Sequence, residues 1–95
     1  GGEWTEILPQ SLNISFTAVP DTRYCGIAVE LVSFPANSEV PVEVKVNARS
    51  YYPVMTTNAI GYVFDYPIGT FTQMSGAVVT VSAGGLTAGP SVISC

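Results

Sequence analysis

VPVEVKVNA, residues 40–48, alternates between apolar and polar side chains. The even-numbered positions hold four valines and Ala48, and the odd-numbered positions hold Pro41, Glu43, Lys45 and Asn47. Because successive side chains of a β-strand point to opposite faces, this period of two predicts a strand with one buried and one solvated face. Proline lacks the N–H that a ladder uses, so Pro41 is expected at the start of the strand or on a sheet edge.

The same alternation recurs along most of the chain. It places Leu12, Ile14 and Phe16 on the inward parity of one expected strand, and Cys25, Ile27, Val29 and Leu31 on that of the next. Tyr62, Phe64 and Tyr66 also share a parity, which favours filling of the core or of an interface. Turns are expected at residues 58–61, where Gly61 can adopt a positive φ, and at residues 67–69 and 84–90.

These patterns predict an all-β fold, specifically an immunoglobulin-like β-sandwich of about seven strands with Greek-key connections. The 95 residues of the chain suit one such domain. Residues 11–95 are expected to form the sandwich, preceded by an N-terminal arm over residues 1–10.

The chain carries unusually little charge. Hydrophobic residues make up 47% of the sequence and charged residues 11%, against roughly a quarter charged in an average domain. Such a surface is covered either by uncharged polar side chains or by a partner, and both possibilities favour an extracellular or virion-surface location. With one lysine, two arginines and a net charge of −4, the chain is not expected to bind nucleic acid. No apolar run reaches the roughly 18 residues that membrane insertion requires.

The two cysteines, Cys25 and Cys95, are 70 positions apart. An even count in a small domain rich in serine and threonine favours one disulfide and an oxidising compartment. Closing so long a loop stabilises a fold by roughly 4 kcal/mol on the chain-entropy account. Two alternatives stay open at this point: a pair of unmodified thiols, or a bond from Cys95 to a neighbouring subunit.

Catalysis and cofactor binding are not expected. The chain has no histidine, so neither a Ser-His-Asp nor a Cys-His arrangement can form, and the usual zinc ligand sets are absent. A carboxylate pair is formally available among the seven acids, but glycoside hydrolysis needs two carboxyls across a cleft, and so small a sandwich has little room for one.

Several residues are candidates for binding. In the N-terminal arm, Trp4, Ile7 and Leu8 are expected either to cover an open end of the sandwich or to pack on another subunit, and Val40 and Pro41 are expected to form an edge that contacts one.

Two further candidates concern sugars. Asn13 opens an Asn-Ile-Ser glycosylation acceptor pattern and has outward parity. Tyr51 and Tyr52, with Tyr62 and Tyr66, are candidates for stacking on sugar rings, although tyrosine is also a common core and interface residue of sheets.

The segment MTTNAIGYVF, residues 55–64, resembles the TTdxxGyvxF hairpin of bacterial immunoglobulin-like and transthyretin-like modules. In those families a later strand resembles residues 77–84, and the likeness covers the chain from residue 40 onward. The resemblance implies a sandwich fold and the roles that such modules serve, as stalks, adhesin repeats and surface or virion decorations.

We therefore expect a structural subunit without enzyme activity. It is expected to assemble with copies of itself, or with other structural subunits, on the outside of a cell or virion, as a filament, a pilus-like thread or a shell component. The alternative is a secreted carbohydrate-binding or adhesin module that uses surface tyrosines.

Overall fold

The computed structural model describes residues 10–18, 25–70 and 76–93. The regular elements in these ranges are all β-strands, so the prediction of an all-β chain is confirmed. In chain order the eight strands are β1 (Ser11–Ala18), β2 (Cys25–Val32), β3 (Glu39–Val46), β4 (Arg49–Tyr51), β5 (Val54–Thr56), β6 (Val63–Thr70), β7 (Ala77–Ala83) and β8 (Leu86–Ile93). Within the described ranges, no helix has the length and apolar character that a membrane crossing requires.

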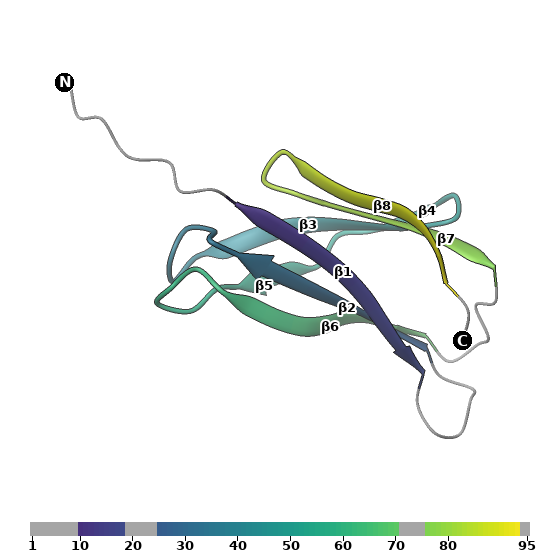
Figure 1. The fold of residues 1–95 in the computed structure, drawn as a ribbon, viewed down its shortest axis with the longest axis horizontal. Coiled ribbons are helices and arrows are strands. Elements are labelled where there is room, and N and C mark those ends of the chain that lie inside the picture. The colour runs from purple at the N-terminus through teal and green to yellow at the C-terminus, as the bar shows by residue number, and fades with distance from the viewer. Residues whose placement is uncertain (1–9, 19–24, 71–75, 94–95) are drawn as a thin grey trace.

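The strands form two antiparallel sheets that lie one over the other (Figure 1). The three-stranded sheet has the order β1-β2-β6. The five-stranded sheet has the order β4-β3-β7-β8, and β5 also pairs with β3. β4 and β5 are short and share one flank of β3, because β5 pairs with its first half and β4 with its second.

Inward-facing side chains of both sheets form one core, and β2, β3 and β7 supply most of it. The buried members are Cys25, Ile27, Val29, Leu31, Phe34, Val40, Val42, Val44, Met55, Ala77, Val79, Val81, Ala83 and Ile93. Leu12 and Ile14 of β1 pack against the margin of this core. Phe16 was expected to face inward as well, but 38% of its surface is exposed, because it lies where β1 reaches the open side of the sandwich.

The strand predicted from the alternation over residues 40–48 ends earlier than expected. β3 stops at Val46, and the chain turns at Asn47, whose φ of 54° lies in the left-handed region that asparagine tolerates. Ala48 is exposed in this turn and does not continue the buried face. Residues 49–51 return as β4, which pairs with the second half of β3.

β3 is paired on both sides from Val42 to Val46, but Val40 and Pro41 pair with β5 alone, so their contact with another subunit stays a prediction. Val40 is buried and lies opposite Met55 of β5. The N–H of Val42 donates to the carbonyl of Pro53 at 2.9 Å. Because N–H groups alternate in direction along a strand, the nitrogen of Pro41 points to the opposite flank, where the β3–β7 ladder ends at Val42. The proline therefore costs no ladder hydrogen bond in the middle of a sheet.

β6 contains an irregularity that reverses its faces. Ile27 lies opposite Ile68 and Val29 opposite Asp65, so β6 has one residue more than β2 in this interval. As a result, Val63 and Ile68 both pack against the core despite their different parity. Phe64 and Tyr66 are 45% and 48% exposed, so they do not fill the core, and the alternative that they fill an interface stays a prediction.

Two expected turns lie inside strands. Residues 67–69 belong to β6, and most of residues 84–90 belong to β8. The turn between β7 and β8 consists of Gly84 and Gly85 alone, and both have positive φ values, of 56° and 81°.

The turn at residues 58–61 connects β5 in one sheet with β6 in the other, so it does not form the expected hairpin. The side-chain oxygen of Asn58 accepts hydrogen bonds from the N–H groups of Ile60 (3.0 Å) and Tyr62 (2.9 Å). Gly61 has a φ of 73°, as its predicted role requires, and its carbonyl accepts a bond from the N–H of Phe34 at 3.1 Å.

Thr57 is the buried polar side chain of the described residues, at 3% exposure. Its hydroxyl donates to the carbonyl of Pro35 at 2.6 Å and accepts from the N–H of Ser38 at 3.0 Å. Thr57 therefore ties the loop between β2 and β3 to the end of β5.

Candidate functional site

The outer face of the three-stranded sheet carries a group of polar and aromatic side chains, which we call the acid–aromatic face: Asn13, Glu30, Tyr62, Phe64 and Tyr66. The strand registers bring its members together. Asn13 of β1 lies opposite Glu30 of β2, and Glu30 lies opposite Phe64 of β6. Directly opposed side chains in antiparallel strands are about 5 Å apart at Cβ, so these three form a row across the sheet.

Glu30 is the centre of the polar contacts on this face. One carboxylate oxygen accepts a hydrogen bond from the Tyr62 hydroxyl at 2.9 Å, and the other lies 3.5 Å from the Asn13 amide nitrogen. The hydrogen bond to Glu30 raises the pKa of Tyr62 above its ordinary 10.0, with smaller contributions from desolvation and from the negative charge of Glu30. Both donors are neutral, so the negative charge of Glu30 is not neutralised within the described part of the chain.

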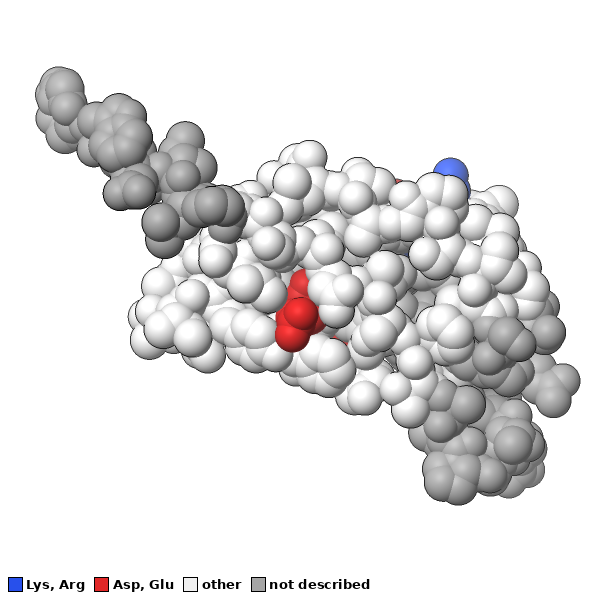
Figure 2. Space-filling view, in the orientation of Figure 1, with Lys and Arg blue, Asp and Glu red and all other residues white. Residues whose placement is uncertain are grey.

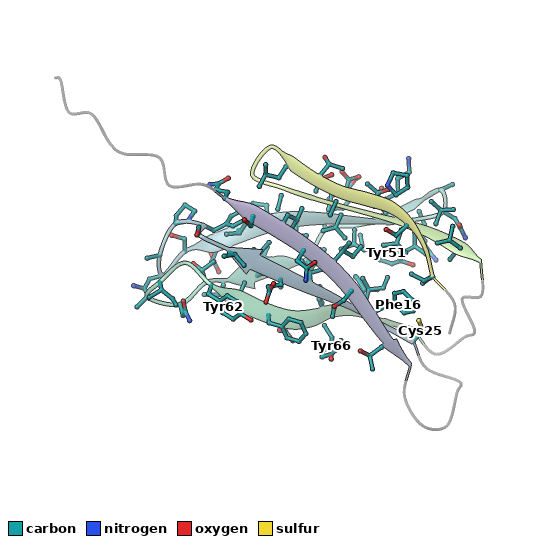
Figure 3. All side chains as sticks on the ribbon, in the orientation of Figure 1. Phe16, Cys25, Tyr51, Tyr62 and Tyr66 are labelled. Atoms are coloured by element: carbon teal, nitrogen blue, oxygen red, sulfur yellow. The ribbon has the colours of Figure 1, made fainter. Side chains whose placement is uncertain are left out.

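The rings of Phe64 and Tyr66 meet edge to face, with centroids 5.6 Å apart and an interplanar angle of 84°. The Tyr66 ring lies over Gly26 of β2, where a Cβ would approach the ring to 3.2 Å. The small residue on β2 therefore leaves the space that this ring occupies. Figure 3 shows Tyr62 and Tyr66 spread along the β6 side of the sheet.

The described cations lie on the five-stranded sheet, which also carries Glu39 and Glu43, and not on the sheet of the acid–aromatic face. Figure 2 shows acidic atoms in the middle of the face that carries β1 and β2, with basic atoms only near its upper right margin. The cations among the described residues are Lys45 and Arg49, on the hairpin of β3 and β4 in the other sheet. The Arg49 guanidinium lies 5.7 Å from the centroid of the Tyr51 ring.

A second feature is an apolar groove of about 320 Å³ between β1 and β8. It is lined by Ile14, Ser15, Phe16, Ile27, Val79, Ser91 and Ile93. β1 and β8 are the outer strands of their sheets and are not hydrogen-bonded to each other. Figure 3 shows Phe16 toward the end of β1, close to Cys25.

The two tyrosines proposed for sugar stacking do not form one platform. Tyr51 lies opposite the inward-facing Val44 and is half-buried. Tyr52 is 74% exposed and borders a shallow hollow of about 290 Å³ together with Pro41 and Glu43. The Ser50 hydroxyl donates to Glu43 at 2.9 Å, so this carboxylate is held beside the hollow.

The other predicted site residues have different outcomes. Asn13 is exposed on β1, and its glycosylation stays a prediction. Cys25 is buried at 1% exposure, and no described cysteine is a free thiol. Its predicted partner Cys95 lies outside the described residues, so the pairing stays a prediction, and the arm residues Trp4, Ile7 and Leu8 also lie outside them.

No group of three or more metal-ligating side chains occurs in the ranges that the structure describes. The acid–aromatic face presents a carboxylate, an amide and three aromatic rings, two of which carry a phenol hydroxyl. Such a set can hold a ligand by hydrogen bonds, charge and stacking.

Sequence reasoning missed Glu30 and Phe64 as surface partners. Glu30 lies between the inward positions Val29 and Leu31, so the alternation places it outward. Its neighbours depend on the extra residue in β6, which leaves no signal in the period of two. Pro67, which lies within this strand, was a sign of the irregularity, because proline inside a strand is typical of bulges.

Comparison of the chain with protein families, with curated proteins and with solved structures gave no match. The function is therefore argued from the geometry of this chain alone.

Proposed function

We propose that the protein is a non-catalytic structural subunit that assembles with copies of itself on the outside of a cell or virion, in a filament, thread or shell. We also propose that the two sheets are an immunoglobulin-like Greek-key sandwich. The strand orders β1-β2-β6 and β4-β3-β7-β8 support this assignment, because β2 pairs with β6 and β3 with β7, which are distant in the chain.

The observation that carries the proposal is the open side between β1 and β8. β1 is an outer strand of eight residues, SLNISFTA, with neither a charge nor a proline. β8 is also uncharged, although it contains Pro90. Natural sheets usually protect such edges with lysine, proline or a covering segment, because an unprotected edge pairs with another chain.

The groove gives this open side an apolar floor. Ile27, Val79 and Ile93 are almost fully buried at its base, and Phe16 and Ile14 are partly exposed at its wall. A strand or apolar side chain from a second copy would gain ladder hydrogen bonds at the edge and bury apolar surface in the groove.

The location outside the cell rests on composition. A charged content of 11% is low for a protein that circulates freely in the cytosol, and the predicted Cys25–Cys95 bond requires an oxidising compartment. Intact mass of the native protein before and after reduction and alkylation tests the bond. Two cysteines that are alkylated without prior reduction would remove this support.

Sedimentation velocity over a range of concentrations tests the assembly. We expect the wild-type chain to form oligomers that Ser15→Lys and Ser91→Lys weaken, because each places a cation at the rim of the groove. Thr87→Lys is the matched control, since Thr87 is exposed on β8 but lies outside the groove. A wild-type chain that stays monomeric at high concentration would refute the proposal.

One observation favours a second function, carbohydrate binding. Tyr52 is the exposed ring beside a shallow hollow that also contains Glu43. A sugar stacked on Tyr52 could donate a hydroxyl hydrogen bond to this carboxylate. Binding on a glycan array that disappears in Tyr52→Ala but persists in Tyr51→Ala would support this function, and an array without signal would eliminate it.

A further inference from the structure

We propose that the acid–aromatic face of one copy receives the β3–β4 hairpin of the next copy, with Arg49 paired to Glu30 and stacked against Phe64 and Tyr66. This inference rests on the proposed self-assembly and names a contact for it. The contact joins two different surfaces, so each copy offers one of each.

The receiving surface has unused capacity for a cation. An ionised carboxylate has about four acceptor positions, and the described contacts of Glu30 are the hydroxyl of Tyr62 and the amide of Asn13. Phe64 lies directly opposite Glu30, and its ring is 45% exposed. A guanidinium placed here forms charge-assisted hydrogen bonds and lies over a ring, a combination that arginine makes better than lysine does.

The donating surface is held in a fixed shape. In the turn after β3, the N–H of Asn47 donates to the carbonyl of Val78 at 2.8 Å, and the Asn47 side-chain oxygen accepts from the N–H of Val78 at 3.0 Å. These two bonds fasten the turn to β7. Lys45 and Arg49 flank this turn in the sequence and are both exposed, so a second copy can reach them, and the backbone that carries them needs little ordering on binding.

The distribution of the remaining charges favours the same contact. The acids of the three-stranded sheet are Glu30 and Asp65, and the described part of that sheet has no cation. On β3, Glu43 is two residues from Lys45 and is tied to Ser50, while Glu39 lies at the opposite end of the strand. The end of the hairpin is therefore locally positive, and the acid–aromatic face is negative.

No described contact joins the two surfaces within one copy. Arg49 of the five-stranded sheet contacts the Tyr51 ring, whereas Glu30 of the three-stranded sheet contacts Tyr62 and Asn13. A contact between unlike surfaces leaves one of each open on every pair, so it extends into a thread unless the rotation between copies closes a ring. This property fits the filament form of the proposed function better than a symmetric dimer.

A charge swap tests the contact. We expect Glu30→Lys and Arg49→Glu each to weaken self-association at least about tenfold, and we expect the double variant to recover to within about threefold of wild type. Glu39→Lys makes the same charge change on an exposed acid outside both surfaces and should leave association unchanged. Thermal unfolding of each variant verifies the fold, and Phe64→Ala tests the stacking without changing the charge.

The outcomes separate this inference from the proposed function. If the groove variants weaken assembly but the charge swap fails to restore it, the hairpin contact is wrong and self-assembly stands. If the wild-type chain is monomeric, both are wrong. If Phe64→Ala and Tyr66→Ala remove a glycan-array signal while assembly is unchanged, the face binds sugar and the hairpin contact is refuted.

Discussion

The side chain of Thr57 offers a sharp test of how the two sheets are joined. Its hydroxyl makes two hydrogen bonds to the loop between β2 and β3, at 2.6 Å to Pro35 and 3.0 Å from Ser38. Thr57→Val keeps a similar shape but removes the hydroxyl. It leaves a backbone carbonyl and a backbone N–H without a partner in a partly buried place.

The expected cost follows from these two bonds. A lost hydrogen bond costs about 1 kcal/mol in net stability, and more where the abandoned partner is buried. Because the loop is partly buried, we expect Thr57→Val to lower the free energy of unfolding by about 2 kcal/mol. For a domain of this size, that corresponds to a fall in Tm of about 10 °C.

Equilibrium urea unfolding, followed by circular dichroism, measures the change. Thr56→Val is the matched control, because the adjacent Thr56 is exposed and should shift stability by less than about 0.5 kcal/mol. Thr57→Ser keeps the hydroxyl and should lose less than Thr57→Val. Equal stabilities for Thr57→Val and Thr56→Val would refute the role assigned to the hydroxyl.

Two further predictions concern a Cβ added at Gly61 and the hydroxyl group of Tyr62. Gly61→Ala should lower the free energy of unfolding by about 3 kcal/mol, because its Cβ would overlap the Phe34 carbonyl at a positive φ. Gly85→Ala, at a positive φ in open space, should cost only about 1 kcal/mol in the same urea titration, and equal costs would contradict the overlap. The raised pKa of Tyr62 means that its neutral form stabilises the fold, so this contribution is complete below pH 10.0 and is lost as the pH rises through the folded-state pKa. Glu30→Gln should move the Tyr62 pKa down toward 10.0 in phenolate absorbance, and an unchanged titration would contradict the assigned cause.

The period of two predicted the core because a strand that buries one face has alternating apolar and polar residues in its own sequence. The prediction succeeded for Val42 and Val44, whose neighbours on both sides are regular ladders. It failed for Phe64, because β6 has one residue more than β2 between the pairs Ile27–Ile68 and Val29–Asp65. The inward-facing parity of β6 therefore changes along the strand. Such a shift depends on a partner far away in the chain, so periodicity within one strand cannot reveal it.

The place of a strand within its sheet was equally hidden from local patterns. Pro41 indicated an edge, and its nitrogen does face a flank without a ladder partner, but the pattern did not reveal that β3 lies between other strands from Val42 onward. The candidate surfaces show the same limit. Outward parity marked Glu30 and Lys45 correctly as exposed or partly exposed, but which side chains stand beside them depends on strand order.

The placement of the first and last described strands makes the resistance of the molecule to a pulling force depend on the direction of that force. β1 begins and β8 finishes toward opposite ends of the long axis in Figure 1. A pull between Ser11 and Ile93 therefore slides β1 lengthwise along β2, and all eight residue pairs of that ladder resist together. Peeling at right angles would break the same pairs one by one. The sandwich should consequently withstand a stretching force along its axis far better than one across it, which is the mechanical behaviour that a link in a chain requires.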